Sequence, residues 1–164
     1  PLVIIASPGH PLAGRRRVPV KEIGQQTFVF REPGSGTRAA IMRFFEKKGV
    51  PIQITMEMTS NEAIKHAVVG GLGISVLSLH TLTLEGVEGP VAILDVKGFP
   101  ILRHWYLVYP KGKELSLVAR TFLDFAVQHG PRLRARMESM WPGLRQVVEA
   151  SDAPPRRRRK KGAR

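Results

Sequence analysis

The segment at residues 33–38, Pro-Gly-Ser-Gly-Thr-Arg, has the composition of an anion-binding turn between a strand and a helix. Backbone N–H groups at the start of a helix lack partners within the helix, and the helix dipole favours a negative charge there. The two glycines allow a ligand to approach the backbone closely. The hydroxyls of Ser35 and Thr37 add donors, and Arg31 or Arg38 adds positive charge. The pattern fits a tight turn with a serine cap equally well, so both interpretations stand at this point.

A second polar segment, Thr59-Ser60-Asn61, also follows a predicted strand and opens a predicted helix. Thr59 and Glu62 have the spacing of a capping box, in which each side chain bonds the backbone of the other residue. Asn61 has no such structural need and is the better ligand candidate. In open parallel sheets, ligands bind outside the carboxyl ends of the strands, where both helix starts would lie. The predicted ligand-binding residues are Arg31, Ser35, Gly36, Thr37, Thr59, Ser60 and Asn61.

Patterns for catalysis and metal binding are weak in this sequence. Ser35 stands in Gly-Ser-Gly rather than in the Gly-x-Ser-x-Gly motif of a nucleophile elbow. The five histidines show neither i, i+4 pairing nor metal-ligand spacing, and His129 is predicted to close the C-terminal end of a helix. The absence of cysteine excludes a thiol nucleophile and any Cys-ligated metal. We therefore predict no catalytic residue, no metal and no cofactor.

The hydrophobic pattern predicts strands that alternate with helices, which is typical of βαβ units and a parallel sheet. A serine at residue 116 is expected to cap the last long helix, and Pro142 to break the apolar stripe that follows it. The predicted strands are residues 2–6, 27–30, 52–56, 74–77, 91–96 and 101–109, and the predicted helices are residues 37–48, 59–69, 80–85, 116–129 and 133–148.

The charge of the chain is concentrated at one end. The 164 residues carry a net charge of +13, from 26 Lys and Arg against 13 Asp and Glu, and residues 154–164 hold seven basic residues and no acidic one. We predict a disordered segment from residue 151 onward, which either binds nucleic-acid phosphates without sequence specificity or is simply a solvated tail. The candidate phosphate contacts are Arg156, Arg157, Arg158, Arg159, Lys160 and Lys161.

Four motifs together resemble the effector-binding region of LysR-type transcriptional regulators, and the regulators of RuBisCO and other carbon-fixation operons in particular. The match in order and spacing covers residues 1–130. The motifs are Leu-Val-Ile-Ile-Ala-Ser-Pro-Gly-His-Pro-Leu at residues 2–12, Arg-Glu-Pro-Gly-Ser-Gly-Thr-Arg at 31–38, Ser-Asn-Glu-Ala-Ile-Lys at 60–65 and Gly-Gly-Leu-Gly-Ile-Ser-Val-Leu-Ser at 70–78.

The resemblance implies an α/β fold made of the second lobe of a type 2 periplasmic-binding-protein-like domain plus part of the first lobe. It assigns residues 1–16 to the end of the first lobe and the crossover, 17–100 to the effector-binding lobe II, 101–150 to the return to lobe I and the C-terminal helices, and 151–164 to the basic tail. The chain begins at Pro1, and we expect it to be a fragment that lacks the DNA-binding domain and the opening half of lobe I.

The resemblance also implies the sensing of a small anionic effector, such as a phosphorylated metabolite or a nicotinamide nucleotide, and no enzymatic activity. Contact with DNA would require the absent helix-turn-helix domain. We expect a cytoplasmic homodimer or homotetramer, and no apolar run approaches the ~18 residues of a membrane span. Two alternatives remain open, namely a periplasmic-type solute-binding protein and an α/β enzyme that uses Ser35 or a histidine as its catalyst.

Overall fold

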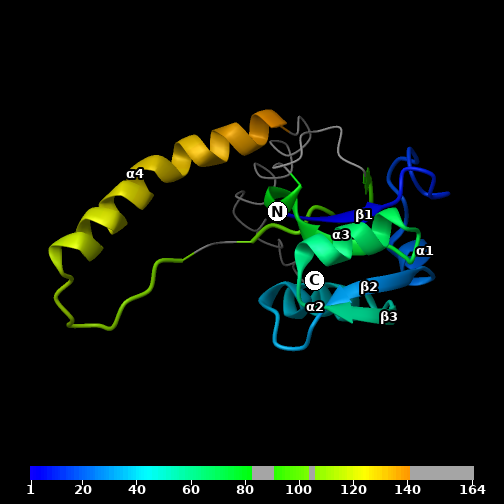
Figure 1. Cartoon of the computed structure of the whole chain (residues 1–164), viewed down its shortest axis with the longest axis horizontal. Helices are drawn as coiled ribbons and strands as arrows, with labels where there is room; N and C mark the ends of the chain where they lie inside the picture. Colours follow the sequence, from blue (N-terminus) through cyan, green and yellow to red (C-terminus); the bar gives the residue numbers. More distant parts are fainter. Residues whose placement is uncertain (83–90, 104–105, 141–164) are drawn as a thin grey trace, which may run out of the picture. The chain divides into compact units, whose positions relative to one another are not determined.

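The computed structural model describes residues 1–82, 91–103 and 106–140 (Figure 1). The chain forms two compact units, Pro1–Trp105 and Tyr106–Arg164, which are described here one at a time. The strands are β1 (Leu2–Ala6), β2 (Thr27–Arg31), β3 (Gln53–Met58), β4 (Ser75–Ser78) and β5 (Ala92–Leu94), and the helices are α1 (Val20–Gly24), α2 (Gly36–Lys48), α3 (Asn61–Val69), a 3-10 turn (Leu79–Thr81) and α4 (Leu117–Met140).

The first unit contains the predicted parallel strands, together with one strand that runs the other way. Strands β2 and β3 pair in parallel, and a parallel bridge between Phe28 and Ile74 joins β2 to the residue before β4. Strand β1 pairs antiparallel with both β4 and β5. The strands thus form two sheets, of order β4-β1-β5 and β2-β3, which the bridge between Phe28 and Ile74 connects. The expectation of a parallel sheet is wrong at β1.

Strand β1 is buried along its whole length, as its unbroken apolar sequence predicts. It lies between β4 and β5, so both of its edges are paired and neighbouring side chains cover both of its faces. The returning segment adds one more bridge, in which Leu2 and Ile101 exchange backbone hydrogen bonds of 2.8 and 3.0 Å. Thus β1 and Ile101 share one compact unit with residues 17–100, while the assignment of these segments to two lobes stays a prediction.

The two helices beside β2 and β3 begin and end largely where the sequence predicts. Ser35 caps α2, and Gly49 ends it with a left-handed φ of 64°. The cap of α3 lies one residue later than expected, because the side chain of Ser60, rather than Thr59, accepts the hydrogen bond from the Ala63 N–H. The predicted capping box of residues 59 and 62 is therefore wrong.

Glu62 bonds forward in α3 instead of back to the cap. Its carboxylate lies 2.7 Å from the ammonium of Lys65, which is almost fully buried and also donates to the carbonyl of Thr81. Lys65 thus takes a place on the buried face of α3 for which the apolar pattern had predicted Ala63, an exposed residue.

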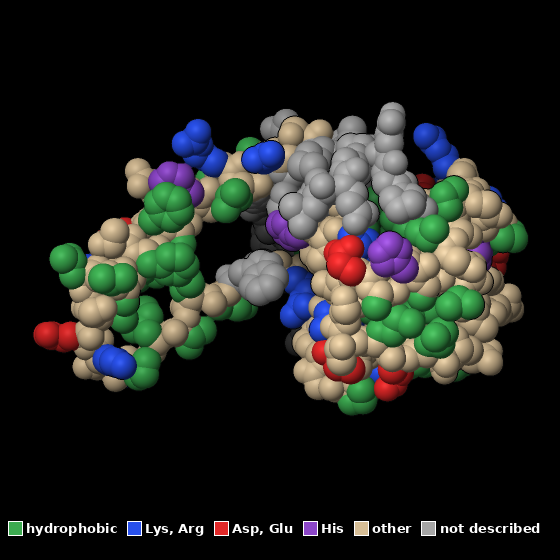
Figure 2. All heavy atoms as spheres, in the orientation of Figure 1, with side chains coloured by type: hydrophobic (Ala, Val, Ile, Leu, Met, Phe, Trp, Pro, Cys, Tyr) green, Lys and Arg blue, Asp and Glu red, His purple; other side chains and the backbone are tan. Residues whose placement is uncertain are grey.

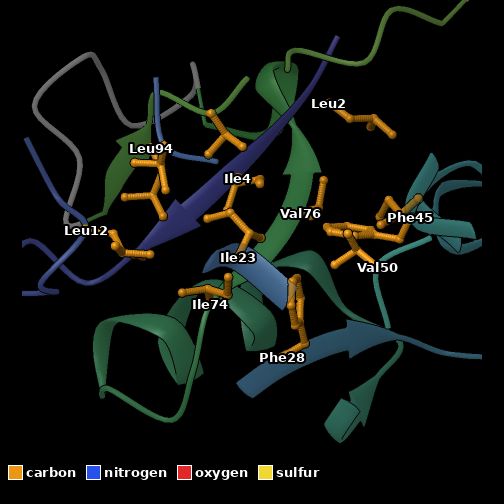
Figure 3. Close-up of a cluster of buried hydrophobic side chains, with 14 of the residues drawn as sticks. Leu2, Ile4, Leu12, Ile23, Phe28, Phe45, Val50, Ile74, Val76 and Leu94 are labelled. Carbon is orange, nitrogen blue, oxygen red and sulfur yellow. The ribbon is translucent and has the colours of Figure 1, made fainter. Parts of the chain in front are cut away.

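The hydrophobic core lies between the strands and α2 (Figure 3). Its centre is aromatic: Phe45 of α2 meets Phe28 of β2 edge-on, with ring centroids 5.8 Å apart. Phe44 packs in the same way on Phe99, at 4.8 Å, so the segment after β5 is held against α2. The buried members of the cluster are Leu2, Ile4, Ala6, Leu12, Val18, Ile23, Phe28, Phe30, Ile41, Phe45, Val50, Ile74, Val76, Leu94 and Val96.

The predicted strand at residues 101–109 is absent from the described part of that segment. Only Ile101 is bridged, and residues 102, 103 and 106–109 lie in no strand. An extended apolar segment needs a neighbouring strand to complete its hydrogen bonds, and these residues have none among those described. Tyr106 and Val108 are exposed accordingly. The predicted short helix at residues 80–85 is observed as the 3-10 turn Leu79–Thr81, and residues 83–90 lie outside the described part.

In the second unit, Ser116 caps α4 as predicted, with its hydroxyl 3.3 Å from the Ala119 N–H. The helix then continues past the predicted end at His129 and includes Pro131, so His129 does not close a helix. Its ring instead hydrogen-bonds the carbonyl of Phe125, one turn earlier. Hydrophobic side chains are exposed along α4 (Figure 2). The predicted break at Pro142 and the disordered tail lie outside the described residues.

Candidate functional site

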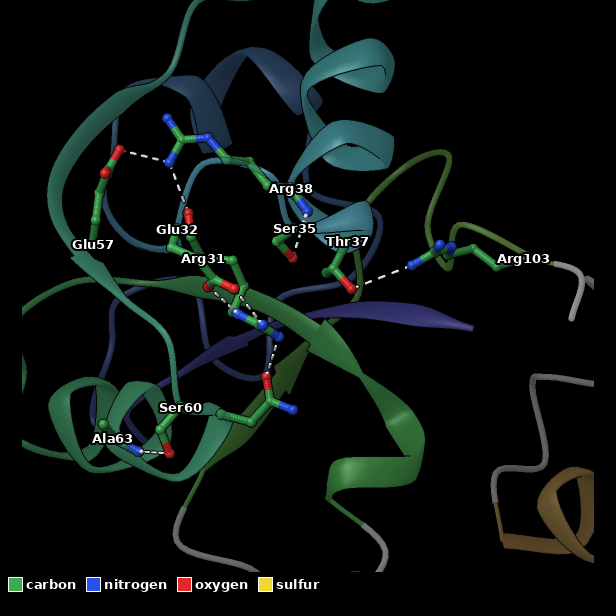
Figure 4. Close-up of polar contacts among 10 residues, drawn as sticks. Arg31, Glu32, Ser35, Thr37, Arg38, Glu57, Ser60, Ala63 and Arg103 are labelled. Carbon is green, nitrogen blue, oxygen red and sulfur yellow. Dashed lines mark hydrogen bonds and ion pairs between the residues drawn. The ribbon is translucent and has the colours of Figure 1, made fainter.

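The carboxyl ends of β2 and β3 bring the two predicted polar segments together (Figure 4). Arg31 is paired with Met58 in the parallel register, so both strands end at the same edge. Helix α2 begins five residues after Arg31, and α3 begins three residues after Met58. The prediction that both helix starts share one edge is confirmed.

The first turn of α2 keeps two backbone donors available. Ser35 N–H donates to the Glu32 carbonyl, and the Arg38 and Ala39 N–H groups donate to the side chain and the carbonyl of Ser35. The N–H groups of Gly36 and Thr37 have no partner among the described residues. These two groups point out of the helix start, where the dipole contributes about half a positive charge.

Ser35 caps α2, as one of the two interpretations of this turn predicts. Its hydroxyl oxygen accepts from the Arg38 N–H at 3.4 Å, which makes it the cap of α2. A hydroxyl that accepts through its oxygen still has its own proton to donate. The Ser35 hydroxyl therefore remains a donor at the same turn, although its backbone N–H is engaged.

Arg31 and Asn61, both predicted ligand contacts, bond each other across the edge. The Arg31 Nη1 donates to the Asn61 Oδ1 at 2.9 Å. The other side of the guanidinium holds Glu32 in a two-point contact of 2.7 and 2.9 Å. The hydrogen bond from Arg31 lowers the pKa of the Glu32 carboxyl below its ordinary value, and the same bond raises the pKa of Arg31.

Arg103 is a site residue that the sequence analysis missed. Its Nη1 donates to the Thr37 hydroxyl at 3.2 Å, and its Nη2 lies 3.4 Å from the place where a Cβ on Gly36 would stand. Arg103 reaches this place because the bridge between Leu2 and Ile101 holds the returning segment at the same sheet edge. Thr37 and Arg103 are 66 residues apart, and no local pattern connects them.

The remaining predicted ligand contacts, Thr59 and Ser60, lie at the start of α3. Ser60 is the cap of α3, and Thr59 is exposed just before it. Neither residue has a hydrogen bond to the α2 turn among the described residues. The basic residues 156–161 lie outside the described part. The residues with described positions contain no cluster of three or more potential metal ligands. None of their helices is long and apolar enough to cross a membrane.

The sequence that forms this sheet edge matches a known protein family. The family model described as the LysR substrate binding domain matches residues 1–131. The chain belongs to the LysR substrate-binding domain family. The predicted family and the predicted α/β fold of the type 2 periplasmic-binding-protein kind are thereby confirmed.

Curated relatives of this LysR domain are transcriptional regulators by name. It is 51% identical over 129 residues to the HTH-type transcriptional activator CmpR of Synechocystis, which covers 79% of the chain and 42% of that protein. It is 50% identical over 137 residues to a RuBisCO operon transcriptional regulator of Allochromatium vinosum, which covers 84% of the chain and 45% of the relative. The chain thus spans less than half the length of these relatives.

Two solved structures have a similar fold. The CcmR regulatory domain of Synechocystis, in complex with 2-PG, superposes with a TM-score of 0.73 at 48% identity, over 76% of this chain and 60% of that one. The effector-binding domain of QuiR in complex with shikimate gives a TM-score of 0.68 at 23% identity, over 80% of this chain and 61% of that one. The second likeness concerns the fold alone.

Proposed function

We propose that this chain is the sensing part of a longer LysR-type regulator of carbon-fixation genes, and that it binds a small anionic metabolite at the first turn of α2. The observation that carries the proposal is the pair of N–H donors at Gly36 and Thr37, which have no partner among the described residues. Hydroxyls at Ser35 and Thr37 and the guanidinium of Arg103 adjoin them. An anion placed there would receive hydrogen bonds from backbone, hydroxyl and guanidinium groups together.

The groups around the α2 turn favour an anion. Helix α2 has no acidic residue in its first turn, so no side chain of the helix itself takes the anion's place. Arg103 donates to a neutral hydroxyl, which an incoming carboxylate or phosphate can replace. Asn61, held by Arg31, keeps its amide N–H groups to bond a hydroxyl or carbonyl of the same ligand.

A phosphorylated acid is the first ligand to test. The regulatory domain of CcmR, 48% identical to this chain, has been solved in complex with 2-PG, or 2-phosphoglycolate. That compound has a phosphate and a carboxylate, and the donors at the α2 turn suit either group. An effector controls a regulator only through its different affinities for two conformations, so binding should shift an equilibrium between states of the longer protein.

The wider partners follow from the same proposal. The names of the relatives favour a regulator that acts on DNA through a separate domain rather than a solute receptor or an enzyme. Such a protein shares a compartment with DNA, so we propose that it is cytoplasmic. We also propose that it is a homodimer or a homotetramer. No residue of the chain is given a catalytic role.

The experiment is calorimetry of 2-phosphoglycolate binding to the full-length gene product, with Thr37→Val as the test variant. Valine keeps the shape of threonine and removes the hydroxyl that now contacts Arg103. A hydrogen bond to a charged group contributes roughly 1.5–3 kcal/mol, so affinity should fall about tenfold or more. The matched control is Thr121→Val, which makes the same change on α4, where the hydroxyl donates to the Leu117 carbonyl of its own helix.

The proposal predicts that the Thr121→Val protein binds as wild type does. Equal affinity in the wild-type and Thr37→Val proteins, with both folded, would remove Thr37 from the site. Full-length protein that binds no phosphorylated or carboxylated metabolite would contradict the proposal as a whole.

A further inference from the structure

From the first turn of α2, the Arg38 side chain contacts two other elements, β2 and β3. Its Nη1 donates to the carbonyl of Arg31 at 2.7 Å and to the Glu57 carboxylate at 2.6 Å. Its guanidinium carbon lies 5.4 Å from the ring centroid of Phe30. About four-fifths of the side chain is covered, since its relative exposure is 21%. Arg38 therefore joins the start of α2 to the end of β2 and to β3.

These contacts close the turn that carries the donors of the candidate site. Residues Pro33, Gly34 and Gly36 are exposed and bury no side chain, and Gly34 has a left-handed φ of 90°. Hydrophobic packing thus contributes little to the position of the turn. The bond from Arg38 to the Arg31 carbonyl spans seven residues and fixes both ends of the turn to each other.

The side chains of Arg38 and Thr37 leave the helix start in different directions. Figure 4 shows the Arg38 side chain directed toward Glu57, whereas Thr37 is directed toward Arg103. A ligand bound at the N–H groups of Gly36 and Thr37 would therefore meet Arg103 rather than Arg38. The Arg38 Nη1 already donates to the carboxylate of Glu57 and to the carbonyl of Arg31.

We infer that Arg38 is a positioning residue, which holds the turn at residues 33–37 in the geometry that binds the effector without contacting the effector itself. The inference rests on the proposed function, since it concerns the affinity of that same site. It assigns the positive charge of Arg38 to the protein's own strands, in contrast with the expectation from sequence that either Arg31 or Arg38 adds charge for the ligand.

The first test needs no ligand. Amide hydrogen exchange is measured in Arg38→Met, and Arg43→Met serves as the matched control, because Arg43 is an exposed arginine of the same helix. We expect exchange of the hydrogen-bonded Ser35 and Ala39 amides to become about tenfold faster or more in Arg38→Met, as the loss of charge-assisted hydrogen bonds predicts. Arg43→Met should exchange as wild type does, and wild-type exchange at the turn in Arg38→Met would overturn the inference.

The second test measures 2-phosphoglycolate affinity in the full-length protein. Arg38→Met should bind about tenfold more weakly, whereas Arg43→Met should bind as wild type does. Arg38→Lys should restore most of the affinity, because its ammonium has three donors for the Arg31 carbonyl and the Glu57 carboxylate. Weaker binding by Arg38→Met with unchanged exchange at the turn would mean that Arg38 contacts the ligand, and it would overturn the inference.

The two tests separate this inference from the proposed function. If the full-length protein does not bind the anion at all, the proposed function fails, and the exchange measurement still decides whether Arg38 holds the turn. Should Arg38→Met fail to fold, Glu57→Gln keeps an acceptor for Arg38 while removing the negative charge. Faster exchange confined to the turn in that variant supports the inference, and wild-type exchange there contradicts it.

Discussion

Replacement of Phe45 by alanine should remove a large part of the stability of the first unit. Phe45 is 1% exposed, and its ring lies within 5.5–6.4 Å of the rings of Phe44, Phe28 and Phe99. Removal of a buried phenylalanine costs roughly 3–5 kcal/mol, from lost transfer energy and from the cavity. Its neighbours come from α2, β2 and the segment after β5, so they have little freedom to fill the space. We therefore expect about 4 kcal/mol.

Urea denaturation followed by far-UV circular dichroism measures this loss. With a typical slope near 2 kcal/mol per molar urea, a loss of about 4 kcal/mol lowers the midpoint by about 2 M. Phe122→Ala on α4 is the control, because that ring is 60% exposed and its removal should change stability by less than about 0.5 kcal/mol. A midpoint shift below about 0.5 M for Phe45→Ala would refute the placement of this ring at the centre of the core.

Three further predictions concern the site and the sheet. Ser35→Ala should lower the unfolding free energy by about 1 kcal/mol in urea denaturation, because the α2 cap is lost, and unchanged stability would contradict the cap. The Glu32 carboxyl has a lowered pKa, so its pairing with Arg31 stabilises the fold above the pKa of an unfolded glutamate and is lost as pH falls through the folded pKa. An NMR titration of the Glu32 side chain should give a lower pKa than in Arg31→Gln, and equal values would disprove the pairing. Gly73→Ala would place a Cβ 2.6 Å from the Thr27 carbonyl oxygen at a φ of 148°, and it should lower the thermal midpoint clearly, by a strain of about 1–3 kcal/mol. A wild-type midpoint in that variant would contradict the close approach of Gly73 to the Thr27 carbonyl.

Local patterns predicted the elements around the site because each pattern depends on neighbouring residues. Strand β2 ends at Arg31, and the capping Ser35 follows four residues later. Gly49 ends α2 in the same stretch of sequence. The cap of α3 was misplaced by one residue because Thr59 and Ser60 both have a hydroxyl that can accept the first free N–H. Periodicity alone does not decide between two adjacent hydroxyls.

Direction and long-range pairing were beyond the sequence pattern. The apolar run of β1 indicates burial on both faces and is the same whether its neighbours run parallel or antiparallel. Residues 106–109 have strand-forming side chains, and a strand forms only where another strand completes its hydrogen bonds. The contact of Arg103 with Thr37 depends on the fold bringing together residues 66 positions apart, for which a single sequence has no signal.

The central claim is that an anion binds at the start of α2, and a crystal structure of the full-length protein with 2-phosphoglycolate tests it most directly. The account predicts a phosphate or carboxylate oxygen at about 2.9 Å from the N–H nitrogens of Gly36 and Thr37, with Arg103 turned toward the same group. Density for the ligand at any other place in the domain, with the α2 turn unoccupied at saturating concentration, would contradict it.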